Sequence, residues 1–127
     1  MIKLIAIDTD GTLLNSQEEI QASTKEAISK ALDRGVKVVL CSGRPIAGLA
    51  PYMNELGIKG EDQYALTLNG AISSKASGEI MTSDLIANSV YRRLTAYALS
   101  LKLPFNIVDF EFRIITPNHD IDPMVYP

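Results

Sequence analysis

The sequence predicts an α/β protein, built on a partial Rossmann-like parallel sheet with flanking helices and followed by a smaller α+β segment. The main observation is that an apolar strand, a polar turn and a helix occur twice in succession before a third strand. This pattern changes after residue 71. We therefore expect one domain over residues 1–82 and a second over residues 83–127.

Composition limits the class of protein. The chain has 127 residues, 46% of them hydrophobic and 21% charged, so it can form a core and is not of the disordered class. The net charge of −3 disfavours binding to nucleic acid through phosphate contacts. Cys41 is the single cysteine, and no apolar run approaches membrane-spanning length. These features predict a cytoplasmic protein that binds neither nucleic acid nor membrane.

The first repeat begins with a strand over residues 2–7, because this run is short, β-branched and almost wholly apolar. A polar, glycine-containing loop over residues 8–12 follows it. The sequence Ser-Thr-Lys-Glu at residues 23–26 matches a capping box and predicts the start of a helix, which Gly35 is suited to end. Residues 36–41 form the second predicted strand.

The second repeat follows the same order. A Ser-Gly-Arg-Pro turn precedes a helix over residues 46–56, which Gly57 ends. Pro51 inside this helix indicates a kink or a later helix start. The third strand is predicted over residues 64–68 and leads into an Asn-Gly turn.

The elements predicted after residue 71 no longer follow the strand–turn–helix order. Residues 71–81 predict a ribbon that turns at a Ser-Gly pair. Ser83 is expected to cap a longer helix that extends to Leu101, with apolar residues at helical spacing. Two further strands, over residues 103–108 and 112–116, are expected to pair antiparallel.

Asp8 and Asp10 are the most informative residues for function. They follow the first predicted strand, and ligands in open α/β sheets bind at the C-terminal ends of strands. Two carboxylates so placed repel each other, and a divalent cation relieves that repulsion. Carboxylate oxygens suit Mg²⁺, and a carboxylate can also attack phosphorus. The alternative is an ordinary acidic turn that closes a strand.

Polar residues also follow the second and third strands. Ser42 has a hydroxyl that can donate to a phosphoryl oxygen, and Arg44 and Asn69 are candidate substrate contacts. Each has a plainer explanation: a simple turn at Ser42, a solvated cation at Arg44, and a left-handed turn residue at Asn69. Because these strand ends share one sheet edge, we expect the three residues to converge.

Three segments carry a family resemblance. They are Asp8-Thr9-Asp10-Gly11-Thr12-Leu13-Leu14, Ser42-Gly43-Arg44-Pro45 and Asn69-Gly70-Ala71. Together they resemble the haloacid dehalogenase (HAD) superfamily, and more narrowly its Cof-type sugar-phosphate phosphatases. The likeness runs from residue 2 to about residue 81 and weakly into a cap domain, which this subfamily inserts after the third strand.

The resemblance implies a Mg²⁺-dependent phosphatase acting on a small phosphorylated metabolite such as a sugar phosphate. Asp8 would be the nucleophile that becomes an aspartyl phosphate, and Asp10 the acid and then the base. The Asp8 carboxylate and the Asp10 backbone carbonyl would bind Mg²⁺. Thr9, where the family often has an apolar residue, would point away. The implied substrate-binding residues are Ser42, Gly43, Arg44 and Asn69.

The resemblance also implies parts that this sequence lacks. In the family, a lysine and a further acidic motif follow the cap, whereas this sequence ends at Pro127, part-way through the expected cap. We therefore expect the polypeptide alone to be weakly active or inactive. The side chains of Lys75 and Lys102 are interpreted as solvated. The residues assigned to a tail without a catalytic role are His119, Asp120 and Asp122.

The first predicted strand gives an expectation about binding partners. In this family it is central, so without neighbours on its far side residues 2–7 become an exposed apolar edge. We expect self-association, pairing with a separate C-terminal half, or a fragment of a longer product. Two other functions stay open: a non-catalytic interaction module with a weak Mg²⁺ or phosphate site, and a phosphoacceptor receiver domain. The Gly-Thr-Leu-Leu sequence after Asp10 argues against the receiver.

Overall fold

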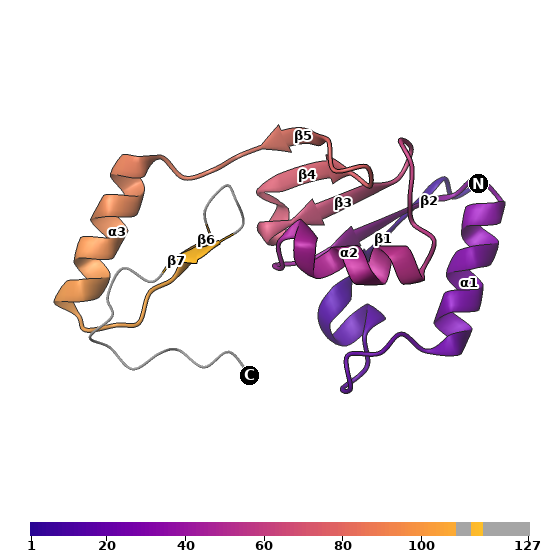
Figure 1. The fold of residues 1–127 in the computed structure, drawn as a ribbon, viewed down its shortest axis with the longest axis horizontal. Helices are drawn as coiled ribbons and strands as arrows, with labels where there is room; N and C mark the ends of the chain where they lie inside the picture. The colour runs from indigo at the N-terminus through magenta and orange to yellow at the C-terminus, as the bar shows by residue number, and fades with distance from the viewer. Residues whose placement is uncertain (109–112, 116–127) are drawn as a thin grey trace. The chain divides into compact units, whose positions relative to one another are not determined.

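The computed structural model describes residues 1–108 and 113–115, and the chain divides into two compact units. The first unit extends from Met1 to Asp84 and the second from Leu85 to Pro127. Figure 1 shows a sheet with helices in the first unit, and a helix with a short strand pair in the second.

The first unit is built on a five-stranded mixed sheet with the order β1-β2-β3-β4-β5. Its strands are β1 (Leu4–Asp8), β2 (Lys37–Cys41), β3 (Tyr64–Thr67), β4 (Ile72–Lys75) and β5 (Ile80–Ser83). The first three strands are parallel, whereas β4 runs antiparallel to β3 and β5 antiparallel to β4. The predicted α/β fold with parallel core strands is confirmed.

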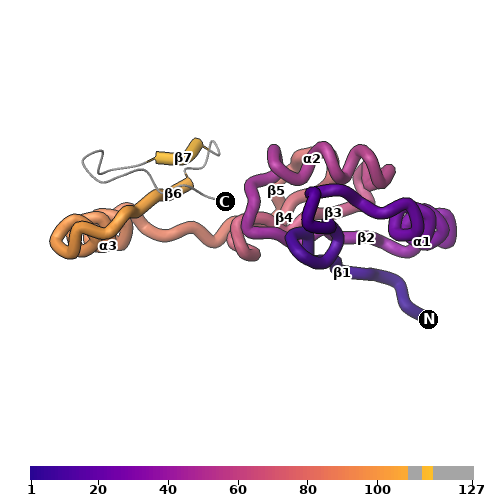
Figure 2. The backbone as a smooth tube through the Cα atoms, turned by 90° about the horizontal axis from the view of Figure 1, so that it is seen from below, coloured from indigo at the N-terminus to yellow at the C-terminus, as the bar shows by residue number. Residues whose placement is uncertain are grey.

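Both α-helices of the first unit pack on one face of the sheet. They are α1 (Ala22–Asp33) and α2 (Ile46–Glu55), and Figure 2 shows α2 along one side of the strands. Ile28 of α1 and Leu49 of α2 belong to the same buried apolar cluster as Val38 and Leu40 of β2. Val38 and Leu40 are two positions apart on a strand and so share one face, which is the face that the helices cover.

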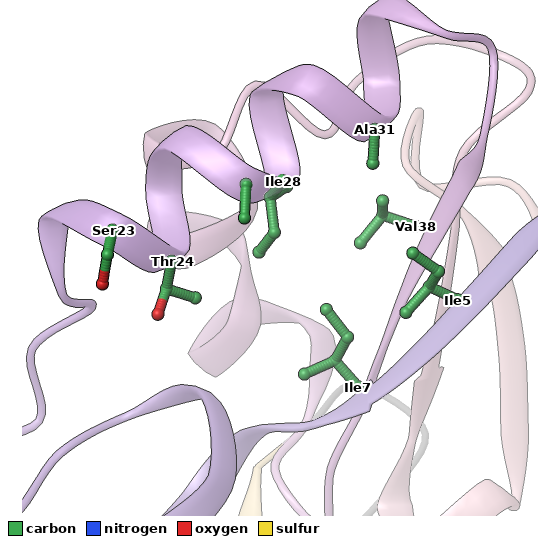
Figure 3. Close-up of a pocket in the computed structure, with 8 residues that line it drawn as sticks. Ile5, Ile7, Ser23, Thr24, Ile28, Ala31 and Val38 are labelled. Atoms are coloured by element: carbon green, nitrogen blue, oxygen red, sulfur yellow. The ribbon is translucent and has the colours of Figure 1, made fainter.

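On the side of β1 away from β2, the described part of the chain places no strand. Among the described strands β1 pairs with β2 alone, and Leu4 is 51% exposed. An apolar groove of about 350 Å³ lies between β1 and α1 (Figure 3). Ile5, Ile7 and Ile28 are among its lining residues. The apolar edge that the sequence predicts is therefore present in the structure.

The start of α1 differs from the prediction. The helix begins at Ala22, its N-cap is Gln21 in an extended conformation, and no side chain caps it. The amides of Thr24 and Lys25 donate to the Gln21 carbonyl, each at 3.0 Å. The predicted capping box at residues 23–26 is thus wrong, because a capping serine needs the extended backbone that Gln21 has while Ser23 already lies in the helix.

The end of α1 agrees with the prediction. Gly35 has a φ of +73°, its amide donates to the Leu32 carbonyl at 2.9 Å, and the Val36 amide donates to the Ala31 carbonyl at 3.0 Å. These two bonds form a Schellman motif, which needs a residue in the left-handed conformation. Gly57 ends α2 with the same pair of bonds.

α2 starts where predicted and runs through its proline. Pro45 precedes the helix in an extended conformation, and Pro51 lies inside it. The alternative of a later start is therefore not what the structure shows. The helix ends at Glu55, one residue before the predicted end.

The link between the units corrects a second expected cap. Ser83 is the last residue of β5 and pairs with Ile72 of β4, so it cannot also begin a helix. The helix α3 (Asn88–Ser100) instead has Ala87 as its N-cap.

The second unit also contains two short strands. β6 (Ile107–Val108) and β7 (Ile114–Ile115) pair antiparallel, as predicted but over fewer residues. Phe112, Thr116, His119, Asp120 and Asp122 lie outside the described residues. Within the part of the chain that the structure describes, no helix has both the length and the apolar character needed to cross a membrane.

Candidate active site

The loop after β1 is a tight turn that brings two acids to the end of the sheet. Asp8 is the last residue of β1, and the amide of Leu14 closes the turn on the Thr9 carbonyl at 3.0 Å. Gly11 has a φ of +76°, a conformation that favours glycine. The Thr12 hydroxyl donates to Asp8 Oδ2 at 3.3 Å, which orients the Asp8 carboxylate.

Thr9 fastens this turn to the neighbouring strand. Its side chain is fully buried, and its hydroxyl donates to the Cys41 carbonyl at 3.0 Å. The hydroxyl is therefore directed at β2. An apolar residue could fill the same space but could not make this bond.

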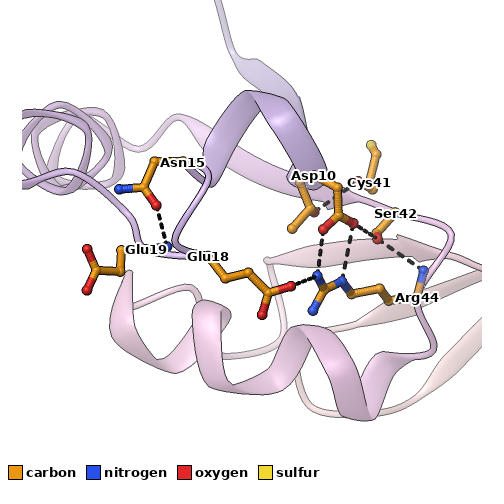
Figure 4. A network of polar contacts seen from close by, with 8 residues as sticks. Asp10, Asn15, Glu18, Glu19, Cys41, Ser42 and Arg44 are labelled. Carbon is orange, nitrogen blue, oxygen red and sulfur yellow. Dashed lines mark hydrogen bonds and ion pairs between the residues drawn. The ribbon is translucent and has the colours of Figure 1, made fainter. Parts of the chain in front are cut away.

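Ser42 follows β2 and meets the first loop. Its side chain is buried, and its hydroxyl lies 3.4 Å from Asp10 Oδ2 as a donor. Ser42 Oγ also accepts a hydrogen bond from the Arg44 amide at 3.0 Å (Figure 4). The structure thus brings Asp10 and Ser42 together at the ends of two parallel strands.

Arg44 is engaged by two acids. Its Nη2 donates to Asp10 Oδ1 at 2.6 Å and its Nε donates to Asp10 Oδ2 at 3.2 Å, which makes a bidentate pair. Nη2 also donates to Glu18 Oε1 at 2.8 Å, and the Tyr52 ring centroid lies 5.9 Å from the guanidinium carbon. The hydrogen bonds to Asp10 and then to Glu18 raise the pKa of Arg44. Arg44 is therefore not the solvated cation of the plainer interpretation.

Asn69 joins the site through the backbone. Its amide donates to the Ser42 carbonyl at 3.2 Å, and the Leu68 amide donates to the Arg44 carbonyl at 3.3 Å. Asn69 has a φ of +57°, which is the left-handed turn conformation that the sequence predicts for its alternative role. A Cβ on Gly43 would lie 3.0 Å from Asn69 Oδ1, so glycine lets this carboxamide lie close. The ends of β2 and β3 are thus held together.

Glu18 is the site residue that sequence reasoning missed. It lies on an exposed loop in a Gln-Glu-Glu run, where nothing in the pattern marks it as different from its neighbours. Only the folded chain brings it to Arg44, which is 26 positions away.

Lys75 pairs with acids other than those of the candidate site. Its ammonium pairs with Glu79 at 2.6 Å and with Glu61 at 3.1 Å, and these two hydrogen bonds raise its pKa. The interpretation of Lys75 as simply solvated is therefore incomplete, because two carboxylates hold it at the β4–β5 hairpin.

Comparison with known proteins gives the family. A family model described as haloacid dehalogenase-like hydrolase matches residues 5–124. The chain belongs to this family. The predicted HAD membership, of Cof type, is confirmed.

Relatives of the chain in this family are longer than the chain. YxeH of Bacillus subtilis is 40% identical over 124 residues, a match to 95% of the chain and 45% of YxeH. A HAD-like hydrolase structure from Bacteroides thetaiotaomicron has a TM-score of 0.80 and 33% identity, covering 94% of the chain and 45% of its own length. A HAD subclass IIB sugar phosphatase has a TM-score of 0.75 and 27% identity, covering 91% and 45%. The chain thus spans less than half the length of these proteins.

The donors at the end of β1 fit Mg²⁺ in kind. The Asp8 carboxylate is exposed, and hard oxygen ligands are what Mg²⁺ prefers. Across residues 1–108 and 113–115, no group of three or more His, Cys, Asp and Glu residues could hold a metal ion. Mg²⁺ takes few protein ligands and keeps several waters, so a small donor set is compatible with it.

Proposed function

We propose that this chain carries the nucleophile-bearing part of a Mg²⁺-dependent phosphatase site for a small phosphorylated metabolite, such as a sugar phosphate. The observation that carries the proposal is the approach of Ser42 Oγ to 3.4 Å from Asp10 Oδ2, which joins the ends of β1 and β2. The family membership and the likeness to a sugar phosphatase support the substrate class.

The residues take the following roles. An Oδ atom of Asp8 attacks phosphorus, the bond to the leaving alcohol breaks, and that alcohol takes a proton from Asp10. Asp10 then takes a proton from water as the water oxygen attacks phosphorus, and the bond from Asp8 to phosphorus breaks to release phosphate. To reach a substrate, Asp10 has to give up at least one of its bonds to Arg44.

The surrounding residues bind and orient the substrate. The Ser42 hydroxyl donates to a phosphoryl oxygen, and Gly43, Arg44 and Asn69 lie at the substrate. The Asp8 carboxylate and the Asp10 backbone carbonyl would hold Mg²⁺. When bound, that ion neutralises negative charge during phosphoryl transfer.

We assign residues 1–82 to the N-terminal part of the catalytic core and residues 83–127 to part of a cap. The chain spans 45% of YxeH, so we expect the polypeptide alone to be a weak catalyst at best. The apolar edge of β1 would be covered by self-association or by pairing with a separate C-terminal half.

Calorimetry with Mg²⁺ and beryllofluoride, a mimic of a phosphoryl group, tests the site. We expect the wild-type chain to bind and Asp8→Asn to weaken binding about tenfold or more, because the charged ligand is lost. Asp62→Asn is the matched control, since Asp62 pairs with Lys37 elsewhere and is exposed. A wild-type chain that binds neither component would refute the proposal.

A non-catalytic module with a weak phosphate site is the second candidate. It is favoured by one observation: both Oδ atoms of Asp10 are occupied by Arg44, which leaves the proposed proton donor engaged. Hydrolysis of p-nitrophenyl phosphate separates the two. Binding without turnover supports the module, whereas turnover at ordinary enzyme rates, roughly 1 to 10³ per second, would refute both the module and the expected impairment.

A further inference from the structure

The guanidinium of Arg44 is shared between two carboxylates through a single nitrogen. Nη2 lies 2.6 Å from Asp10 Oδ1 and 2.8 Å from Glu18 Oε1, whereas Nε contacts only Asp10 among the described residues, at 3.2 Å. A guanidinium nitrogen of this kind carries two hydrogens, so it can serve both acceptors at once. Glu18 therefore does not displace Asp10 but adds a second anchor.

The loop that carries Glu18 is held in shape by its own contacts. Asn15 Oδ1 accepts the amides of Gln17 and Glu19, each at 2.9 Å, and the Asn15 carbonyl accepts the Glu18 amide at 3.0 Å. Glu18 itself has a φ of +59°, an uncommon conformation for a residue with a side chain. This closed loop presents the Glu18 carboxylate to Arg44 while the side chain of Glu19 points elsewhere (Figure 4).

We propose that Glu18 is a positioning residue: it holds Arg44 beside Asp10, and it retains Arg44 when Asp10 turns toward a substrate. This inference rests on the proposed function for the role of Asp10, but the arrangement itself does not depend on it. Without Glu18, Arg44 would have Asp10 as its only carboxylate partner in this network and would follow it.

Glu18 matters because Arg44 and Asp10 form a bidentate pair. Two parallel hydrogen bonds resist rotation of the carboxylate, since a rotation distorts both of them. A third bond joins the same guanidinium to Glu18, whose backbone is held in the closed loop, and it retains Arg44 when the bonds to Asp10 break. The position of Arg44, and through it the resting position of Asp10, is then set partly by a residue outside the three family segments.

Nuclear magnetic resonance of the full chain tests the inference without any need for turnover. The signals to follow are the Arg44 Nε–H pair, assigned with Arg44→Lys, and the Asp10 Cγ carbon. We expect Glu18→Gln to move both signals by more than a linewidth, and Glu18→Asp to return them part of the way. Glu19→Gln is the matched control, because it removes one neighbouring charge of the same loop, and it should leave both signals in place.

Two outcomes would overturn the inference: signals that do not respond to Glu18→Gln, or signals that respond equally to Glu19→Gln. The first would mean that Arg44 is fixed by Asp10 alone, and the second that only the charge of the loop matters. Failure of the proposed function would be seen separately, as unchanged Asp8 and Ser42 signals when Mg²⁺ and beryllofluoride are added to the wild type. That failure leaves the result on Glu18 intact.

Discussion

The pKa of the Cys41 thiol depends in part on the charge of Asp8 at the end of β1. It pairs with Asp8 across the parallel ladder and precedes Ser42. Burial raises the pKa of its thiol, the negative charge of Asp8 raises it further, and a backbone hydrogen bond to Ile7 acts in the opposite direction. Less of the thiol is therefore ionised at a given pH than in an unfolded chain, and only the thiolate is a good nucleophile.

This gives a test of the Asp8 charge that needs no ligand. We expect the rate of alkylation of Cys41 by iodoacetamide to rise with pH at a midpoint above that of the urea-unfolded chain. Asp8→Asn removes the repulsion of the thiolate and should move the midpoint down, without bringing it fully to the unfolded value because burial remains. A midpoint unaffected by Asp8→Asn would show that the two groups do not interact.

At the scale of elements, the ends of the helices depend on backbone conformation more than on side-chain caps. The Schellman motif after α1 requires Gly35 at a φ of +73°, and an added Cβ would meet no atom within 4 Å. The free-energy cost of replacing this glycine therefore comes from the backbone conformation and not from a collision with a neighbouring residue. A side chain in the left-handed region costs roughly 1–2 kcal/mol.

We accordingly expect Gly35→Ala to lower the free energy of unfolding by about 1 kcal/mol, measured by urea titration. Gly35→Asn is the matched variant, because asparagine adopts the left-handed conformation more readily and should lose less. Equal stability of the alanine variant and the wild type would contradict the assigned role of this position.

The first unit presents an apolar strand edge. Backbone groups on the free side of β1 have no neighbouring strand among the described residues, Leu4 is 51% exposed, and the apolar groove lies alongside. Edges of this kind are templates for pairing with another chain, and proteins usually protect them with charge or short length.

We expect the apparent mass from light scattering to increase with protein concentration. Leu4→Lys should suppress the increase, because a charged side chain on an edge strand opposes pairing. Ile80→Lys on β5, the opposite edge of the sheet, is the control and should have little effect. A monomer at all concentrations, or suppression by Ile80→Lys alone, would contradict association through β1.

The repeated strand–turn–helix order was enough to predict the α/β fold. Apolar periodicity predicted the elements better than it predicted burial, since Val90, Leu94 and Tyr97 of α3 are exposed. Ser23 and Ser83 show a further limit: both match a cap in sequence, yet one lies inside α1 and the other in β5. A short capping pattern is weak, since pairing of neighbouring strands and packing of the helix face decide where a helix begins.

Only part of the candidate site could likewise be predicted from the sequence. The positions of Asp8, Ser42 and Asn69 at strand ends follow from the order of the strands, so sequence alone indicated that they would converge. The pairing of Arg44 with Asp10 joins residues 34 positions apart, and that with Glu18 needs the closed loop after Leu14. Such contacts depend on tertiary geometry that no local pattern encodes.

The bonds that join the ends of β2 and β3 run between main-chain atoms, from the Leu68 amide to the Arg44 carbonyl and from the Asn69 amide to the Ser42 carbonyl. At the two carbonyl positions any amino acid supplies the same acceptor, and at the two amide positions only proline removes the donor. The side chains of Ser42 and Arg44 are therefore not needed for these bonds, and substitutions there leave the main-chain frame in place. Under the proposed function, substrate contacts at these two strand ends can change while the main-chain bonds that join β2 and β3 are kept.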